Sequence, residues 1–246
     1  MKTVLITGCS SGFGLETARY FLERDWRVVA TMRTPNADAL PTSPNLRVLA
    51  LDVMDPASIR QCLEAAGPID VLVNNAGIGM LGALEGTPIE TARTVFETNT
   101  LGTIALTQAV LPQFRERRAG IVINVTSTVT LRPLPLLSVY TASKAAVNAF
   151  TESLALELEP FGVQVKLVLP GRAPTTRFGQ NAQPRMQGAI PEAYADLAKK
   201  VFAGWGEPGP VTDSVDVAEA VWRAATDPSC AMRTPAGEDA IAWFNA

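Results

Sequence analysis

A glycine-rich loop between a strand and a helix constrains the fold of this chain more than any other feature. Residues 3–7 form an apolar, β-branched run that predicts a buried strand, and Gly8-x-x-x-Gly12-x-Gly14 follows at once. The apolar spacing after the loop predicts a helix. Such glycines let the backbone approach a pyrophosphate, and the unpaired N–H groups of the new helix bind the anion. We therefore expect a dinucleotide site here, with an ordinary tight turn as the alternative.

The rest of the chain alternates strand-like and helix-like segments, as βαβ units require. Further strands are predicted at residues 27–31, 46–51, 69–73, 120–126 and 163–169. Helices are predicted at residues 56–66, 88–97, 103–117 and 140–158. We therefore expect one α/β domain over residues 1–246, a doubly wound parallel sheet of the Rossmann type with helices on both faces.

Residues 172–212 interrupt this pattern. They are rich in Pro, Gly, Gln and Thr, yet they also carry large apolar side chains such as Phe178, Phe202 and Trp205. This composition predicts a mobile, partly helical lid over the site. A disordered insertion is the alternative, but disordered segments rarely contain so many large apolar residues.

A tyrosine and a lysine four residues apart are the candidate proton-transfer pair in a chain without histidine. Tyr140 and Lys144 share one face of the predicted helix 140–158, so the ammonium is expected to lower the phenol pKa by ~1–3 units. Ser127 stands at the carboxyl end of the predicted strand 120–126, where ligands bind in open α/β sheets. The alternative is a helix face with a solvated lysine and a half-buried ring.

Several motifs, in order and spacing, resemble the short-chain dehydrogenase/reductase family over essentially the whole chain. They are Thr7 to Gly14, Asn74-Asn75-Ala76-Gly77, Asn99, Ser127, Tyr140 with Lys144, and Pro170-Gly171 followed by Thr175. The amino-acid sequence of the glycine loop looks most like that of the branch that contains 17β-hydroxysteroid and retinol dehydrogenases. Bacterial reductases of unrelated substrates look similar.

The resemblance implies a role for each matching residue. Tyr140 donates the proton to a carbonyl, Ser127 hydrogen-bonds its oxygen, Lys144 tunes the tyrosine and holds the nicotinamide ribose, and Asn99 fixes a relay water. The remaining matches imply cofactor contacts by Gly8, Ser10, Ser11, Gly12, Phe13, Gly14, Asp52, Val53, Asn74, Ala76, Gly77, Pro170, Gly171 and Thr175. Two alternatives stay open: Asp52 as the cap of the helix near Pro56, and Asn99 as a helix-terminating residue.

The end of the second strand predicts the cofactor. NAD-specific proteins of this fold place an acid there to bind the ribose hydroxyls, whereas the 2′-phosphate of NADP(H) needs a cation. The chain has Ala30-Thr31-Met32-Arg33, with no acid. We expect Arg33 to bind the phosphate, with Ser11 as a second donor, and the cofactor to be NADP(H). A solvated surface arginine is the alternative.

Apolar residues near the expected site predict a hydrophobic ketone, aldehyde or alcohol as substrate. They lie in the loop 131–139 and at Met80, Leu81 and Leu84. Arg172 departs from the family pattern after Pro-Gly, and cofactor phosphate, a polar substrate group or solvent are its possible partners.

Two rival functions remain. One is a catalytically silent dinucleotide sensor or scaffold, which would be expected to lose the tyrosine or the lysine. The other is an epimerase, dehydratase or enoyl reductase of the same broad fold.

Composition bears on partners and location. A net charge of −3 gives no reason to expect nucleic acid or an anionic membrane as partner. Neither a signal peptide nor an apolar run long enough to span a bilayer is recognised, so we expect a cytoplasmic protein. The three cysteines are scattered and fit free thiols. The family resemblance implies a homodimer or homotetramer.

Overall fold

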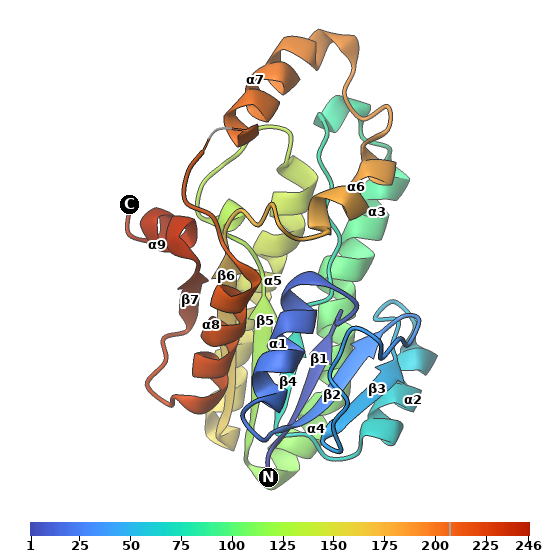
Figure 1. Ribbon diagram of the computed structural model, residues 1–246, viewed down its shortest axis with the longest axis vertical. Helices are drawn as coiled ribbons and strands as arrows, with labels where there is room; N and C mark the ends of the chain where they lie inside the picture. The colour runs from blue at the N-terminus through green and yellow to red at the C-terminus, as the bar shows by residue number, and fades with distance from the viewer. Residues whose placement is uncertain (207) are drawn as a thin grey trace.

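Residues 1–206 and 208–246 are described by the computed structural model, and within them seven strands form one parallel sheet (Figure 1). The strand order is β3-β2-β1-β4-β5-β6-β7, with every neighbouring pair parallel. The bounds are β1 Thr3–Thr7, β2 Arg27–Met32, β3 Leu46–Ala50, β4 Val71–Asn74, β5 Gly120–Val125, β6 Val163–Pro170 and β7 Arg233–Ala236. The direction of winding reverses between β1 and β4, which confirms the predicted doubly wound α/β sheet.

Helices cover both faces of the sheet, as predicted. The α-helices are α1 Gly12–Leu22, α2 Pro56–Ala66, α3 Ile89–Phe96, α4 Gly102–Arg117, α5 Ser138–Leu158, α6 Phe178–Met186, α7 Ala195–Gly206, α8 Ser214–Thr226 and α9 Glu238–Phe244. A π-helical turn, η2 (Glu97–Leu101), joins α3 to α4, and short 3₁₀ turns form η1 Leu84–Gly86, η3 Thr128–Thr130, η4 Glu159–Phe161 and η5 Glu192–Tyr194.

Alternate residues of each strand enter two separate cores. In β1, Val4 and Ile6 belong to the core beneath α1 and α8, whereas Leu5 belongs to the core beneath α2, α4 and α5. All three side chains are fully buried. Because successive side chains of a strand point to opposite faces, an apolar run with no polar alternation is what a sheet covered on both faces requires.

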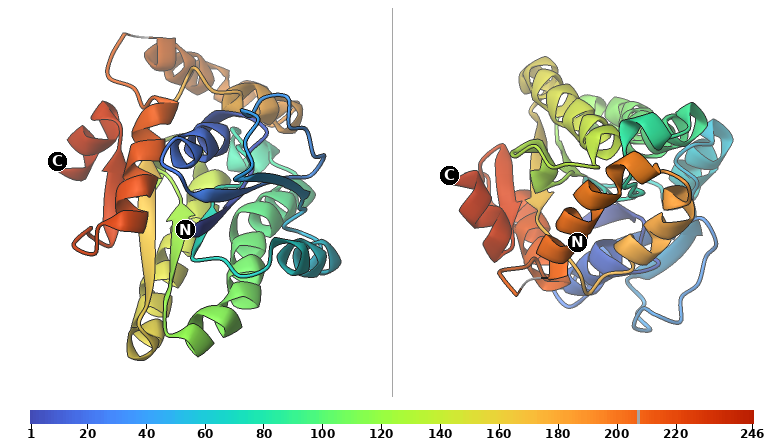
Figure 2. Two further views of the ribbon diagram at one scale, coloured as in Figure 1. Left: turned by 60° about the horizontal axis from the view of Figure 1, so that its bottom comes forward. Right: turned by 90° about the horizontal axis from the view of Figure 1, so that it is seen from above.

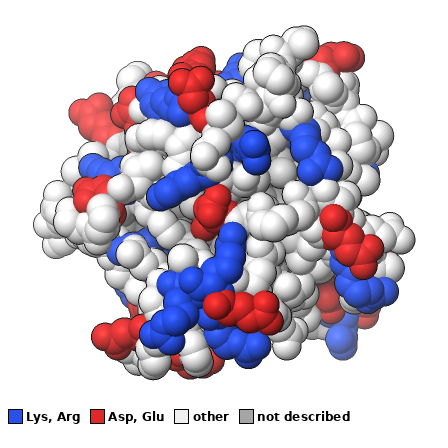
Figure 3. Space-filling view, turned by 90° about the horizontal axis from the view of Figure 1, so that it is seen from below, with Lys and Arg blue, Asp and Glu red and all other residues white. Residues whose placement is uncertain are grey.

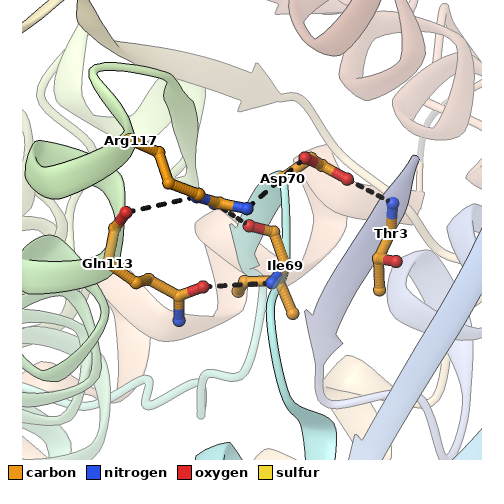
Figure 4. Close-up of polar contacts among 5 residues, drawn as sticks. All are labelled: Thr3, Ile69, Asp70, Gln113 and Arg117. Atoms are coloured by element: carbon orange, nitrogen blue, oxygen red, sulfur yellow. Dashed lines mark hydrogen bonds and ion pairs between the residues drawn. The ribbon is translucent and has the colours of Figure 1, made fainter.

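Side-chain contacts delay the start of β4, which was expected at residue 69. The Ile69 N–H donates to Gln113 Oε1 at 3.1 Å, and the Ile69 carbonyl accepts from the Arg117 guanidinium. Asp70 accepts from the Thr3 N–H at 2.7 Å and pairs with Arg117 (Figure 4). These contacts tie β1 and α4 to the chain just before β4, and the Ile69 N–H is bonded to a side chain rather than to a neighbouring strand.

The edge strand β7 was not predicted. It has four residues, and Pro235 among them lacks an N–H, so its sequence carries little strand signal. Proline is tolerated at an edge because one side of the strand has no partner. Pairing with β6, with Thr234 opposite Val168, forms this strand.

The 172–212 segment lies above the carboxyl ends of the strands, where α6 and α7 are drawn in orange (Figures 1 and 2). Its two ends meet, since the Thr212 N–H donates to the Arg172 carbonyl at 2.8 Å and the Gly171 N–H donates to Thr212 Oγ1 at 2.9 Å. Helices α6 and α7 agree with the expected helical content, and residue 207 lies outside the described residues.

Acidic and basic side chains are interspersed on the face that Figure 3 shows. Cys9, Cys62 and Cys230 are free thiols, and all three are buried. No helix among the described residues is long and apolar enough to cross a membrane.

Candidate active site

A cavity of about 580 Å³ lies at the carboxyl ends of the strands, where the predicted site was placed. Its wall combines the glycine loop with the chain that follows β2, β3, β4 and β5, part of α5, and the beginning and end of α6. The cavity therefore runs along the switch point of the sheet and beneath the 172–212 segment.

The glycine loop packs tightly against the chain that follows β4. Thr7 Oγ1 accepts from the N–H groups of Asn75 and Ala76 at 2.9 and 2.8 Å, and Asn75 Nδ2 donates to the Thr7 carbonyl at 2.8 Å. A Cβ added to Gly14 would lie 2.5 Å from Asn75 Nδ2, so no larger residue fits there. Gly14 itself packs behind the loop, and the predicted residues that line the cavity here are Gly8, Ser10, Ser11, Gly12 and Phe13.

The amino terminus of α1 opens onto the cavity. Ser11 is its N-cap, yet the Ser11 hydroxyl makes no capping hydrogen bond, and the first turn contains no acidic side chain. Such a helix start offers backbone N–H donors and a positive dipole end to an anion.

The ends of β2 and β3 bring Arg33, Asp52 and Val53 to the cavity wall. Arg33 is exposed and makes no ion pair with the described part of the chain. Asp55, rather than Asp52, caps α2, because its side chain accepts from the Ala57 N–H at 2.8 Å. This removes the alternative in which Asp52 is the helix cap.

Only some of the predicted site residues after β4 line the cavity. Ala76 and Gly77 line the cavity, whereas Asn74 does not. The Asn74 side chain is buried, and its Nδ2 donates to Asn124 Oδ1 at 2.8 Å and to Thr107 Oγ1 at 3.0 Å. Asn74 is therefore part of the polar contacts that join β4, β5 and α4.

Tyr140 and Lys144 lie on α5, and both line the cavity although they are almost fully buried. Ser127 follows β5, is buried and lies outside the cavity wall, close enough to Tyr140 for its side chain to act on the pKa of the phenol. Ser127 Oγ also accepts from the Val129 N–H at 3.3 Å. The Lys144 ammonium donates to the Val125 carbonyl at 3.1 Å. The structure thus brings together the three residues that the sequence placed thirteen and four positions apart.

The expected lowering of the Tyr140 pKa by Lys144 is wrong for this structure. Burial raises the Tyr140 pKa well above its usual value, and the side chain of Ser127 opposes that rise only in part. Burial also lowers the pKa of Lys144 to about 8. Removal from water disfavours the charged form of both groups, so Tyr140 is a neutral phenol that can donate a proton at neutral pH.

Asn99 lies within η2 rather than at a helix end, which corrects the helix-terminating alternative. Its Oδ1 accepts from the Ile78 N–H at 2.8 Å, while its Nδ2 donates to the Ile78 carbonyl and to Ser143 Oγ, both at 3.0 Å. A Cβ added to Gly77 would lie 3.2 Å from both Asn99 Oδ1 and Lys144 Nζ. Asn99 therefore stands beside Lys144 but outside the cavity wall. Single π-helical turns occur often at functional sites.

The chain after β6 departs most from the prediction. Pro170 and Gly171 do not line the cavity, and Thr175 is exposed, whereas its neighbour Thr176 lines it. Arg172 also lies away from the cavity wall, and its Nη1 donates to the Trp205 carbonyl at 2.6 Å, which ties α7 to the base of the segment.

Other cavity residues were missed. Asn75 lies within the predicted Asn74–Gly77 motif, but the sequence assigned it no role. Five residues of the 172–212 segment also line the cavity, and no local sequence pattern marks them as site residues: Thr176, Arg177, Phe178, Asn181 and Arg185.

The predicted apolar residues are distributed unevenly. Met80 and Leu81 are buried, but Leu84 is 67 % exposed on η1 and does not contribute to the site. Leu81 packs with Leu136 of the loop 131–139 and with Ala198 of α7. None of these residues lines the cavity, so the 172–212 segment packs on an apolar cluster outside its wall.

Comparison with known proteins agrees with this geometry. The family described as short chain dehydrogenase matches residues 2–186. The chain is 38 % identical over 238 residues to the uncharacterized oxidoreductase YusZ of Bacillus subtilis, covering 92 % of this chain and 85 % of that protein. It is 37 % identical over 228 residues to human retinol dehydrogenase 8, covering 84 % and 73 % of the two chains, in agreement with the predicted branch.

A solved structure, the closed form of serine dehydrogenase complexed with NADP+, superposes with a TM-score of 0.82 at 29 % identity and covers 96 % of this chain and 95 % of that one. The fold, the family match and these relatives agree: the chain belongs to the short-chain dehydrogenase/reductase family of oxidoreductases.

Proposed function

We propose that the protein is an NADP(H)-dependent oxidoreductase that reduces a hydrophobic ketone or aldehyde to an alcohol, and catalyses the reverse reaction, with Tyr140 as general acid and base. The observation that carries this proposal is the placement of Tyr140 and Lys144 in the wall of a cavity that also reaches the start of α1 and Arg33.

The cavity fits a dinucleotide phosphate. Cations at Arg33, Lys144, Arg177 and Arg185 line it, and Asp52 is the one acidic side chain in the described part of its wall. The start of α1 supplies N–H donors for a pyrophosphate, and Arg33 with Ser11 supplies donors for a 2′-phosphate. The serine dehydrogenase of similar fold was solved with NADP+, which supports the same choice here.

A nicotinamide dinucleotide, when bound in this cavity, would supply the hydride. The Ser127 hydroxyl orients the substrate oxygen, and the neutral Tyr140 phenol donates a proton to it as negative charge develops. The Lys144 ammonium is held by the Val125 carbonyl one helical turn from Tyr140, and its proposed role is to stabilise negative charge on Tyr140 after the transfer. Asn99 positions the Ile78 backbone and Ser143 beneath this group, and it is the side chain that would hold a relay water.

A hydrophobic substrate is supported by Phe178 in the cavity wall and by the buried apolar residues beneath the 172–212 segment. Met80, Leu81 and Leu136 are buried there, partly against residues of that segment. We propose that the segment acts as a lid, which opens to admit the substrate and excludes water when it closes.

The family resemblance also favours a homodimer or homotetramer formed through α4 and α5. Leu156 on α5 is 73 % exposed and fits such a contact. Size-exclusion chromatography with light scattering tests this expectation, and a monomer at all concentrations would contradict it.

Oxidation of NADPH, followed by its absorbance with aryl ketones, β-keto esters, steroids and retinal, tests the proposed function. We expect turnover with at least one hydrophobic carbonyl and formation of the alcohol. NADPH binding without turnover of any carbonyl would favour the sensor or scaffold instead. Hydride consumption without an alcohol product would favour another reaction class of the same fold.

A further inference from the structure

Two arginines from distant parts of the chain line the cavity. Arg33 follows β2, and Arg185 lies in the last turn of α6 within the 172–212 segment. Arg185 has no role in the proposed proton transfer by Tyr140. Its position therefore calls for a separate explanation.

Backbone carbonyls fix the Arg185 side chain in place. Its Nε donates to the Gly79 carbonyl at 2.8 Å, and its Nη2 donates to the Asn181 carbonyl at 2.5 Å. The first bond links residues 106 positions apart, so Arg185 joins α6 to the chain that follows β4. Its Nη1 makes no hydrogen bond within residues 1–206 and 208–246, which leaves donors of the guanidinium available to a ligand.

The charge of Arg33 is close enough to act on Arg185. Burial, and after it the positive charge of Arg33, lower the pKa of Arg185. Two guanidinium groups that share a cavity repel each other, and in the described wall Asp52 is the one carboxylate that offsets them. An anion that contacts both guanidinium groups is attracted to each of them and offsets their mutual repulsion. A phosphate has several oxygens, so it can accept hydrogen bonds from both groups at once.

We propose that Arg185 is a second ligand for the 2′-phosphate of the dinucleotide, which bridges Arg33 on the body of the protein and Arg185 on the segment above it. This inference rests on the proposed NADP(H) dependence and extends it. A bound 2′-phosphate holds α6 over the cavity, whereas a dinucleotide without that phosphate leaves the contact between α6 and the body weaker. Arg185 thereby determines cofactor specificity and couples cofactor binding to the position of the lid.

Binding of adenosine 2′,5′-bisphosphate and of 5′-AMP, measured by titration calorimetry, isolates the 2′-phosphate from the rest of the cofactor. We expect Arg185→Ala to weaken the bisphosphate by about tenfold or more while it changes 5′-AMP by less than about twofold, because a charge-assisted contact to one group is lost. Arg185→Gln keeps an N–H donor for Gly79 but removes the charge, and it should weaken the bisphosphate similarly. Lys200→Ala removes an exposed charge from α7 outside the cavity and should change neither ligand.

The outcomes separate this inference from the proposed function. If Arg33→Ala weakens the bisphosphate but both Arg185 variants bind it as tightly as wild type, Arg185 is not a ligand and NADP(H) dependence stands. If neither the Arg33 nor the Arg185 variants lose affinity, both proposals fail. Inorganic phosphate should bind far more weakly than the bisphosphate, and equal, Arg185-dependent binding of the two would indicate a general anion site instead.

Hydrogen exchange of residues 178–186 tests the coupling to the lid. NADP+ should slow exchange of this helix more than NAD+ does when each saturates the protein, and the difference should vanish in Arg185→Gln. Equal protection of α6 by NADP+ and NAD+ in wild type would overturn the coupling.

Discussion

The aromatic ring of Phe178 lies against the ring of Tyr140, with 5.6 Å between the ring centroids and 59° between the ring planes. Gly79 provides the space, because a Cβ added there would lie 2.7 Å from Phe178 Cε1. Phe178 begins α6, whereas Tyr140 belongs to α5, so this contact places the 172–212 segment directly beside the proposed proton donor. A carbonyl that reaches Tyr140 therefore meets the Phe178 ring.

Phe178→Ala should broaden the range of accepted substrates. Loss of the ring opens space beside Tyr140, so we expect the ratio of kcat/KM for a bulky aryl ketone to that for a small methyl ketone to rise by about tenfold. Phe202→Ala is the matched control, since Phe202 pairs with Trp205 on α7 and does not line the cavity. An equal rise in both variants would mean that lid stability, rather than the Phe178 ring, limits access.

Tyr140→Phe should lower kcat by at least ~10², the usual contribution of a general acid, while the dissociation constant for NADPH stays nearly unchanged. The ring is kept, so packing against Phe178 is preserved. Tyr20→Phe on α1, away from the cavity, removes the same hydroxyl and should retain full activity. A folded Tyr140→Phe variant with wild-type kcat would disprove the mechanism.

Arg33→Ala should reduce the preference for NADPH over NADH by about one to two decades in kcat/KM, since a charge-assisted contact of roughly 1.5–3 kcal/mol is lost. Met32→Asp combined with Arg33→Ala should reduce it further, because a carboxylate binds ribose hydroxyls and repels the 2′-phosphate. Arg60→Ala, an exposed arginine on α2 outside the cavity, serves as the charge control. Steady-state kinetics with both cofactors measure the ratio, and a wild type that prefers NADH would contradict the assignment.

Lys144 should make the stability of the protein depend on pH in a defined window. Burial lowers its pKa from 10.5 to about 8, so between these values the unfolded chain holds more protons than the folded chain. The free energy of unfolding therefore rises as the pH rises through this window. Relative to Lys144→Met, which cannot titrate, wild type should gain up to about 3 kcal/mol from pH 8 to 10.5, as followed by urea unfolding.

The exposed residue Lys199 on α7 provides the control for that measurement. Lys199→Met should leave the pH dependence of wild type intact, because an exposed lysine has nearly the same surroundings in both states. If the stability curves of wild type and Lys144→Met run parallel, the ammonium of Lys144 is not buried in solution.

Local patterns were sufficient for most of the sheet. Six of the seven strands in the described residues lie within two residues of their predicted ends, because buried parallel strands are continuous apolar runs. The exception, β7, is short, contains Pro235 and depends on β6 for its pairing. The start of β4 was also misplaced, since Ile69 bonds to side chains of α4 that no local pattern reveals.

The sequence by itself determined which candidate site residues lie together at the carboxyl edge of the sheet. Parallel strands of one sheet end along the same edge, so the glycine loop, Arg33 and Asp52 had to lie near one another once each was assigned to a strand end. The four-residue spacing likewise placed Tyr140 and Lys144 on one face of α5.

Only the tertiary structure decided the direction of the pKa shifts and the contribution of the lid. Burial raises the pKa of Tyr140 by more than Ser127 lowers it, and burial depends on everything packed around α5. Arg185 and Phe178 reach the cavity through contacts with Gly79, about a hundred positions earlier in the chain. Such contacts arise from how the segment folds back over the sheet, and a periodicity read within a few residues contains no information about them.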